Sequence, residues 1–296
     1  MKPLHDRIVG CIIGGAIGDY IGSPLEGRIG PLNVIIPASS EITDDTQLTL
    51  ATCEAIMRAG RPNPEAIAHA FGEWFSQRRI SGMGSSTLKA LRDITFGAHW
   101  ALAGASGEMS AGNGAAMRIA PLAFCVDARS LEGRRAIKDA SWVTHRNDEA
   151  FAGALAIALA IATPDFDFIS TVLAELPDSN TADRLQLLAS EHDVSIADFG
   201  IRYGASGYVA DSVPLALIAA SRAGVSGFQD AVVGVIACGG DTDTTGSMVG
   251  QIVGSKVGLS GIPDELVSLP FGREPVRRIA DEFADWIEMN TGSRTR

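Results

Sequence analysis

Two runs of glycines at four-residue spacing constrain the fold of this chain more than any other feature. The first comprises Gly10, Gly14, Gly18 and Gly22, and the second comprises Gly246, Gly250, Gly254 and Gly258. In a helix this spacing places all the glycines of a run on one face, and two such smooth faces can approach each other closely. We therefore predict that helices over residues 7–20 and 246–258 pack together. The alternative is that each glycine face packs against some other helix.

Two pairs of acidic residues stand directly before predicted helices. Asp241 and Asp243 follow two glycines and lead into the second glycine helix, and Asp44 and Asp45 precede a helix predicted over residues 47–58. Each acid alone is an ordinary N-cap residue, but paired carboxylates repel each other unless a cation lies near them. Carboxylate and hydroxyl oxygens suit magnesium, manganese or calcium better than zinc. The two pairs together therefore indicate a metal site.

Composition narrows the class of protein. The 296 residues can bury a substantial core, and 46% hydrophobic with 20% charged residues is typical of a globular protein. A formal net charge of -11 argues against a nonspecific nucleic-acid surface. The four cysteines form no C-x-x-C pair, which indicates reduced thiols and no disulfide frame or zinc site. The apolar stretch 8–17 is too short to span a membrane, so we expect a cytoplasmic protein that does not bind membranes.

Helical spacing of apolar residues continues along most of the chain. Residues 150–161 are apolar on every side, which predicts a buried central helix capped by Asn147 or Asp148. Asp6 is a candidate N-cap of the first helix. Only residues 33–36 resemble a strand. We therefore predict an all-α fold in a single domain, residues 1–296. The further predicted helices cover residues 64–77, 87–92, 131–143, 168–176, 182–191, 195–203, 211–223 and 228–237.

Five segments, in this order, resemble the motifs of the ADP-ribosylglycohydrolase family. They are Gly18-Asp19-x-x-Gly22-x-Pro24-x-Glu26, Thr43-Asp44-Asp45-Thr46, Gly112-Asn113-Gly114-Ala115-Ala116-Met117-Arg118, Thr144-His145 and Gly239-Gly240-Asp241-Thr242-Asp243-Thr244. Residues 207–212 give a weaker sixth match. The family includes the dinitrogenase-reductase-activating glycohydrolase and the ADP-ribosylserine and ADP-ribosylarginine hydrolases. The resemblance implies a compact orthogonal bundle of helices around a dinuclear cleft that binds Mg²⁺ or Mn²⁺.

The resemblance also implies roles for individual residues. The metal ligands would come from both acid motifs: Thr43, Asp44, Asp45, Asp241, Asp243 and Thr244. Glu26 corresponds to a loop glutamate that acts in acid/base catalysis or in gating, and it would form the catalytic set with Asp44 and Asp243. Backbone amides would line the ADP-ribose diphosphate at Gly112, Asn113, Gly114 and Ala115, and His145 would contact the same ligand.

These residue types suit the hydrolysis of an ADP-ribosyl bond. Cleavage at the anomeric carbon of ribose passes through an oxocarbenium-like state. Two cations can hold the ribose hydroxyls and lower the pKa of a bound water, whose proton Glu26 or Asp44 can accept. Glycine-loop amides near a helix N-terminus can bind a diphosphate without a basic patch. We expect the substrate to be an ADP-ribosylated protein or a small ADP-ribose conjugate.

Two other functions stay open at this point. The same metals could serve a nucleotide phosphoesterase. The scarcity of Lys and Arg near the motifs argues against this function, because little positive charge is available to stabilise a phosphoryl transition state. A non-catalytic, crystallin-like relative could keep the fold, but it would have no need to retain unpaired carboxylates.

Residues beside the motifs carry secondary predictions. Asp19 is predicted to be structural, Arg118 to brace the glycine loop, and Tyr208 and Asp211 to form part of the site wall. Residues 146–149 are Arg-Asn-Asp-Glu, where the family often has a proline and small residues. The sequence therefore does not predict which ADP-ribose linkage is cleaved.

Overall fold

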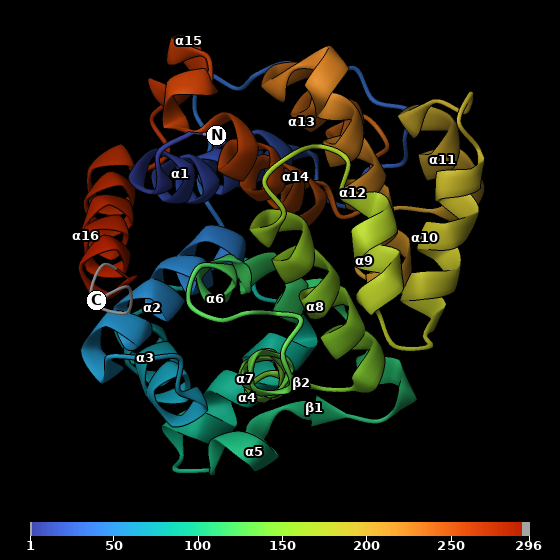
Figure 1. The fold of residues 1–296 in the computed structure, drawn as a ribbon. Coiled ribbons are helices and arrows are strands. Elements are labelled where there is room, and N and C mark those ends of the chain that lie inside the picture. Colours follow the sequence, from blue (N-terminus) through green and yellow to red (C-terminus); the bar gives the residue numbers. More distant parts are fainter. Residues whose placement is uncertain (1, 292–296) are drawn as a thin grey trace.

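Two long helices, α1 (Leu4–Gly22) and α14 (Thr242–Val257), lie side by side and form the most extensive helix–helix contact among the described residues (Figure 1). They run antiparallel, because Gly10 faces Gly254, Gly14 faces Gly250 and Gly18 faces Gly246. A Cβ atom added to any of these glycines would overlap the backbone of the facing helix. The predicted packing of the two glycine faces is therefore confirmed.

The computed structural model describes residues 2–291, so Met1 and residues 292–296 of the predicted domain lie outside the described residues. The other α-helices of the first half are α2 (Asp44–Ala59), α3 (Pro64–Ser76), α4 (Ser85–Thr95), α5 (Trp100–Ala103), α6 (Ala120–Ala123), α7 (Leu131–Trp142) and α8 (Asp148–Ala162). Those of the second half are α9 (Ile169–Glu175), α10 (Asn180–Ser190), α11 (Ile196–Tyr203), α12 (Val209–Ser226), α13 (Phe228–Ile236), α15 (Asp264–Val267) and α16 (Arg273–Thr291). Short 3-10 helices are η1 (Ser23–Leu25), η2 (Glu108–Ser110), η3 (Asn113–Arg118) and η4 (Leu259–Gly261).

This arrangement confirms the predicted all-α fold, and α5, α6, α15 and α16 add to the predicted helices. The strands of residues 2–291 are β1 (Ala105–Ser106) and β2 (His145–Arg146), which pair in parallel with Ala105 opposite His145. The strand-like fragment 33–36 is irregular. It lies between Pro31 and Pro37, which have no backbone N–H to donate to a ladder.

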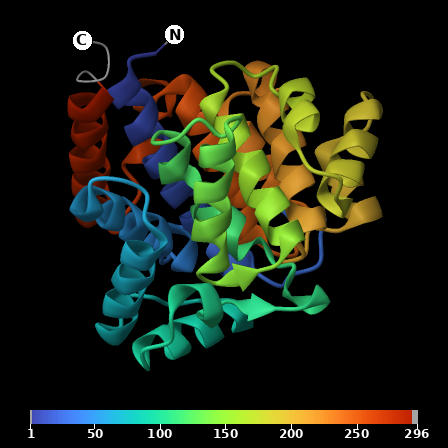
Figure 2. The same cartoon turned by 60° about the horizontal axis from the view of Figure 1, so that its bottom comes forward.

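Helix α8 occupies the centre of the molecule, with α16 on one side and α10 and α11 on the other in both views (Figures 1 and 2). Its residues from Ala152 to Ile161 are all buried, as predicted from an apolar surface on every side. Asn147 is the N-cap, because its side chain accepts hydrogen bonds from the amides of Glu149 and Ala150. The alternative cap, Asp148, is the first helical residue and pairs with Lys138 at 2.9 Å.

Two buried cations satisfy carbonyls at the C-terminal end of α8. Arg7 donates from Nη2 to the Ile161 carbonyl at 3.2 Å, and from Nε to a carbonyl of α14 at 2.9 Å. Lys256 donates to the carbonyls of Ala160 and Thr163. The last carbonyls of a helix lack partners within it and carry partial negative charge, so these contacts fix α8 to α1 and α14.

The start of α1 differs from the sequence prediction. The helix begins at Leu4, so Asp6 lies inside the first turn and is not the N-cap. Its carboxylate accepts instead from the amide and hydroxyl of Ser260, at 3.0 and 2.8 Å. The apolar stretch is also longer than predicted: residues 4–25 have the length and composition to cross a membrane, but 83% of the most apolar 18-residue window within them is buried inside the fold. Its burial among other helices accounts for its apolar character.

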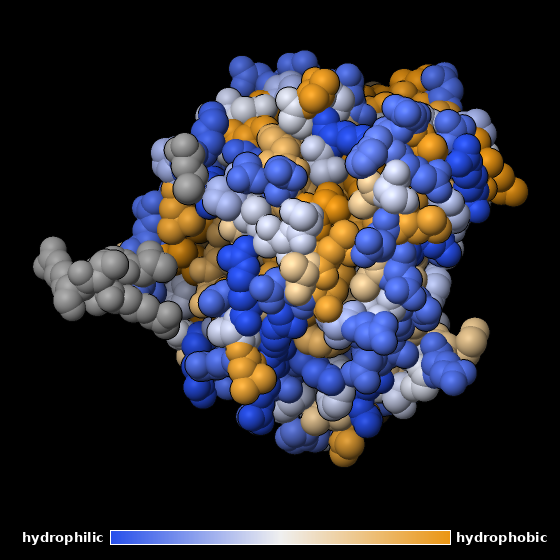
Figure 3. Space-filling view, turned by 45° about the vertical axis from the view of Figure 1, so that its right-hand side comes forward, coloured by the Kyte–Doolittle hydropathy of each residue, from blue (hydrophilic) through white to orange (hydrophobic). Residues whose placement is uncertain are grey.

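The outer face of α9 to α12 has the mixed surface expected of a folded domain. Hydrophilic residues predominate on it, and hydrophobic residues occur singly or in small groups between them (Figure 3). The apolar residues of the core are instead concentrated in α1, α8, α12 and α14.

Candidate active site

A cavity of about 730 Å³ opens where the N-termini of α2 and α14 meet. Its other walls are the loop after η1, the segment 82–87, the segment 108–114 and the segment 206–208. The lining side chains with polar or charged groups are Glu26, Asp44, Asp45, Ser85, Ser86, Thr87, Glu108, Asn113, His145, Ser206, Tyr208, Asp241, Asp243 and Thr244. Among residues 2–291, none that lines the cavity is a lysine or an arginine.

A turn at Gly239 and Gly240 places one set of acids. Both glycines have positive φ, at 76° and 73°, and a Cβ on either would collide with neighbouring backbone. Gly240 exchanges backbone hydrogen bonds of 2.8 Å with the loop that follows η1. This pairing brings Glu26 beside Asp241, so that carboxylate oxygens of Glu26, Asp241 and Asp243 lie within 4.8 Å of one another. Burial and the charge of Asp241 raise the pKa of Glu26.

The second acid motif reaches the same cavity from α2. Thr43 is the N-cap of α2, and its hydroxyl accepts from the Asp45 amide at 3.4 Å. The Oδ2 atom of Asp45 accepts from the hydroxyls of Thr43, at 3.2 Å, and Thr244, at 3.1 Å. Asp45 and Thr244 are 199 residues apart in the chain. The structure therefore brings the two predicted halves together.

Asp19 supports this arrangement from behind. It is fully buried, and its carboxylate accepts from the amides and hydroxyls of Thr43 and Thr46. Burial raises the pKa of Asp19 to about 6, while the hydrogen bonds from Thr46 and Thr43 oppose the rise. These four donors satisfy the hydrogen-bonding capacity of the Asp19 carboxylate, in line with the predicted structural role. Thr43 is turned toward Asp19 and Asp45 and does not line the cavity.

The concentrated negative charge perturbs the acids themselves. Burial, followed by the charge of Asp19, raises the pKa of Asp44 to about 8. Burial, followed by the charge of Asp241, raises the pKa of Asp243 to about 9. Burial and then the charge of Asp243 raise the pKa of Asp45 well above its usual range. Such raised values mean that this group of carboxylates is costly to ionise without compensating positive charge.

These residues fit divalent cations. They supply carboxylate and hydroxyl oxygens, the donors that Mg²⁺ and Mn²⁺ prefer. The Oδ1 atom of Asp45 is buried and has no hydrogen-bond partner among the described residues, although buried polar atoms normally have one. A cation beside Asp45 would give the Oδ1 atom a partner and would relieve the repulsion between Asp45 and Asp243.

The glycine loop forms the wall opposite the acids. A Cβ atom on Gly114 would lie 2.6 Å from the ring of His145, so the imidazole packs on the loop because this residue is glycine; a Cβ on Gly112 would lie 3.1 Å from the ring. The Asn113 amide donates to the Gly207 carbonyl at 3.0 Å, and is thus already bonded within the protein. Ala115 is fully buried behind the loop and does not line the cavity.

The side chain of Asn113 joins the two walls. Its Nδ2 atom donates to Asp241 Oδ2 at 2.8 Å and to the Ser212 hydroxyl at 3.1 Å. This contact was not predicted from the sequence, where the resemblance implied a role for the backbone amide of Asn113 and none for its side chain.

A chain of hydrogen bonds sets the state of His145. Arg118 donates to the Thr144 hydroxyl at 2.6 Å, and this hydroxyl lies 2.8 Å from His145 Nδ1. Burial, followed by the charge of Arg118, lowers the pKa of His145 to about 3, so the ring is neutral. If the Thr144 proton is donated to Nδ1, the ring proton is on Nε2, the nitrogen beside the glycine loop. Arg118 thus braces the loop, as predicted, through Thr144 and His145.

Several residues differ from their expected positions or were not expected. Tyr208 lines the cavity, but Asp211 does not, and it binds Ser206 and Arg184 instead. Glu149, in the segment that departs from the family motif, caps α10 through the amides of residues 180 and 181. Unexpected lining comes from Ser85, Ser86, Thr87, Glu108, Met109 and Ser206. The Gly-Ser-Ser-Thr segment 84–87, at the N-cap and first turn of α4, was the one sequence signal that could have indicated part of this set.

Comparison with known proteins gives consistent matches over nearly the whole chain. The family model described as ADP-ribosylglycohydrolase matches residues 1–293. The chain is 28% identical to ADP-ribosylarginine hydrolase Tri1 of Pseudomonas putida, over 95% of this chain and 78% of that protein. It is 26% identical to ADP-ribosylhydrolase ARH3 of Danio rerio, over 87% and 84% of the two chains. A solved structure titled ADP-ribosylglycohydrolase-related protein complex has the same fold, with a TM-score of 0.72, 24% identity and coverage of 97% and 100%.

Proposed function

Because the chain belongs to the ADP-ribosylglycohydrolase family, we propose that it hydrolyses the bond between ADP-ribose and an acceptor side chain in the cavity between α2 and α14. The observation that carries this proposal is the meeting of Asp45 with Thr244 and of Glu26 with Asp243 in one cavity. The family is metal-dependent, and the residues that would hold two Mg²⁺ or Mn²⁺ ions are Thr43, Asp44, Asp45, Asp241, Asp243 and Thr244. Of these, Thr43 would act mainly by fixing Asp45.

The chemistry divides between the ions and the side chains. When bound, the ions supply positive charge that holds the ribose hydroxyls and lowers the pKa of water. Glu26 or Asp44 accepts a proton from the attacking water, whose oxygen forms the new bond to the anomeric carbon as the bond to the acceptor breaks. The acceptor leaves with a proton. The Gly112–Gly114 loop and the neutral His145 face the position proposed for the diphosphate.

We further propose that the acceptor is cationic, an ADP-ribosylated arginine. In the part of the chain that the structure describes, the cavity lining has carboxylates and no lysine or arginine, and Glu26 and Glu108 are both exposed. A guanidinium group that departs past these carboxylates is attracted, whereas an acidic acceptor is repelled. The similarity to the arginine hydrolase Tri1 supports the same choice.

Replacement of single acids tests the proposed reaction. Asp44→Ala and Asp243→Ala should abolish the metal-dependent release of free ADP-ribose, because each removes a carboxylate from the cavity. Circular dichroism should show that both variants remain helical. Unchanged turnover in either variant would contradict the assignment, and release of AMP or phosphate would indicate a phosphoesterase.

A panel of conjugates tests the acceptor. Arginine-, serine- and nucleobase-linked ADP-ribose should be compared by kcat/KM at one metal concentration. The arginine conjugate should be hydrolysed fastest, and Glu108→Gln should reduce this preference. Faster hydrolysis of the serine conjugate by the unaltered protein would refute the cationic acceptor, while leaving the hydrolase assignment intact.

A further inference from the structure

The segment 204–208 joins the two walls of the cavity. It leaves α11 at Gly204, which has a φ of 86°, and it enters α12 at Val209. On one side, the Ala205 carbonyl accepts from the Asp241 amide at 2.7 Å. On the other, the Gly207 carbonyl accepts from the Asn113 amide at 3.0 Å. A shift of this segment would therefore move the acid motif and the glycine loop together.

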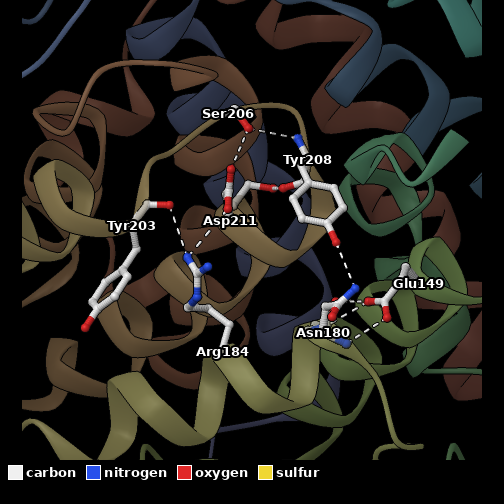
Figure 4. Close-up of polar contacts among 9 residues, drawn as sticks. Glu149, Asn180, Arg184, Tyr203, Ser206, Tyr208 and Asp211 are labelled. Atoms are coloured by element: carbon white, nitrogen blue, oxygen red, sulfur yellow. Dashed lines mark hydrogen bonds and ion pairs between the residues drawn. The ribbon is translucent and has the colours of Figure 1, made fainter. Parts of the chain in front are cut away.

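The two ends of the segment are held by one side chain from outside the cavity. Arg184, on α10, donates to the Tyr203 carbonyl at 3.1 Å and lies 3.6 Å from Asp211 in the first turn of α12 (Figure 4). Asp211 also accepts from the Ser206 hydroxyl at 2.7 Å. The side chains of Arg184 and Asp211 are only 28% and 19% exposed. Such partly buried contacts of a charged group are stronger than those of an exposed pair.

The middle of the segment has a second attachment. The Tyr208 amide donates to the Ser206 hydroxyl at 3.2 Å, and the Tyr208 hydroxyl accepts from Asn180 Nδ2 at 3.1 Å (Figure 4). Asn180 is in turn fixed by Glu149, whose carboxylate accepts from the backbone amide of Asn180 at 2.7 Å. The first turn of α10 thus supports the aromatic side chain that lines the cavity.

We propose that Arg184 and Asp211 are positioning residues, which hold the segment 204–208 so that Asp241 and the glycine loop keep their separation. Neither residue lines the main cavity. Their contacts fix the backbone at Tyr203 and the hydroxyl of Ser206. The Ala205 and Gly207 carbonyls, which adjoin Ser206 in the chain, are thereby held in place as well. The kinetic consequence of this inference rests on the proposed hydrolase function, but the structural consequence does not.

Hydrogen exchange of the metal-free protein tests the structural consequence. In Arg184→Gln, the amides of Asn113 and Asp241 should exchange on the order of ten times faster, because their acceptors lie on the released segment. Amides within α1 and α16 should be unchanged. Arg184→Lys, which keeps a positive charge near Asp211, should restore part of the protection. Arg134→Gln is the matched control, since Arg134 is 27% exposed and pairs with Glu175 elsewhere.

Two results would overturn the inference: unchanged exchange at Asn113 and Asp241 in Arg184→Gln, or faster exchange to the same extent in α16. If Arg184→Gln does not fold, Asp211→Asn provides the same comparison. In the kinetic arm, Arg184→Gln should raise KM for an ADP-ribose conjugate about tenfold, the usual scale for residues that orient ligands. Its kcat at saturating metal should change less than KM. If the unaltered protein releases no ADP-ribose, the proposed function fails and the exchange result still decides the inference.

Discussion

The carboxylate of Asp45 shows how closely the two acid motifs depend on each other. One of its oxygens accepts from Thr43 and Thr244, and the other is buried without a partner among the described residues. Burial and the charge of Asp243 raise its pKa. A protein that only needed to fold would gain from a neutral side chain here, so the acid is retained at a cost to stability.

Asp45→Asn therefore has opposite effects with and without metal. In metal-free protein we expect Tm to rise by about 2–4 °C, which corresponds to roughly 1 kcal/mol of relieved repulsion. The rise in Tm on addition of Mg²⁺ or Mn²⁺ should disappear, because a metal ligand is lost. Differential scanning fluorimetry measures both. Asp178→Asn, at an exposed position, is the control and should change neither. A lower metal-free Tm together with a full metal response would contradict this explanation.

At the scale of elements, the site depends on how closely α1 and α14 approach. The glycine faces let the backbones touch, so the loop after α1 reaches the turn that precedes Asp241. A side chain between these helices would separate Glu26 from the acids of α14. The glycines thus serve the site as well as the core.

Two glycine-to-alanine substitutions separate packing from helix propensity. Gly14→Ala places a Cβ against the Gly250 carbonyl, so it should destabilise the protein by about 1–3 kcal/mol. Gly234→Ala lies within α13 with open space around its Cβ, so it should stabilise the protein by about 0.5–1 kcal/mol. Urea unfolding measures both changes. Equal changes of the same sign would show that the α1–α14 contact imposes no steric limit.

Across the whole molecule, segments far apart in the chain meet at one cavity, and the buried α8 packs at the centre without lining it. Sequence periodicity predicted the buried α8 from the apolar surface of residues 150–161, because that pattern is local. The glycine runs predicted two smooth helix faces, and the structure selects their mutual packing over the alternative of separate partners. The acid motifs likewise indicated their own position at the N-termini of α2 and α14.

The parts that escaped prediction depend on contacts between distant segments. Nothing local to Asn113 indicates that its amide group would bind Asp241. Asp211 was expected in the site wall, since its motif adjoins Tyr208, but its carboxylate turns outward to Arg184 and Ser206. Such directions follow from how α10, α11 and α12 pack, which spacing along one segment does not determine.

The most direct test of the central claim is anomalous X-ray scattering from crystals of this protein grown with Mn²⁺. Two manganese peaks should lie between the α2 and α14 acids, with Asp45 and Asp243 among their ligands. In crystals of Asp45→Asn, at least one peak should be lost. Absence of manganese from this cavity at saturating concentration, or its binding only elsewhere on the molecule, would contradict the claim that the two motifs form one metal site.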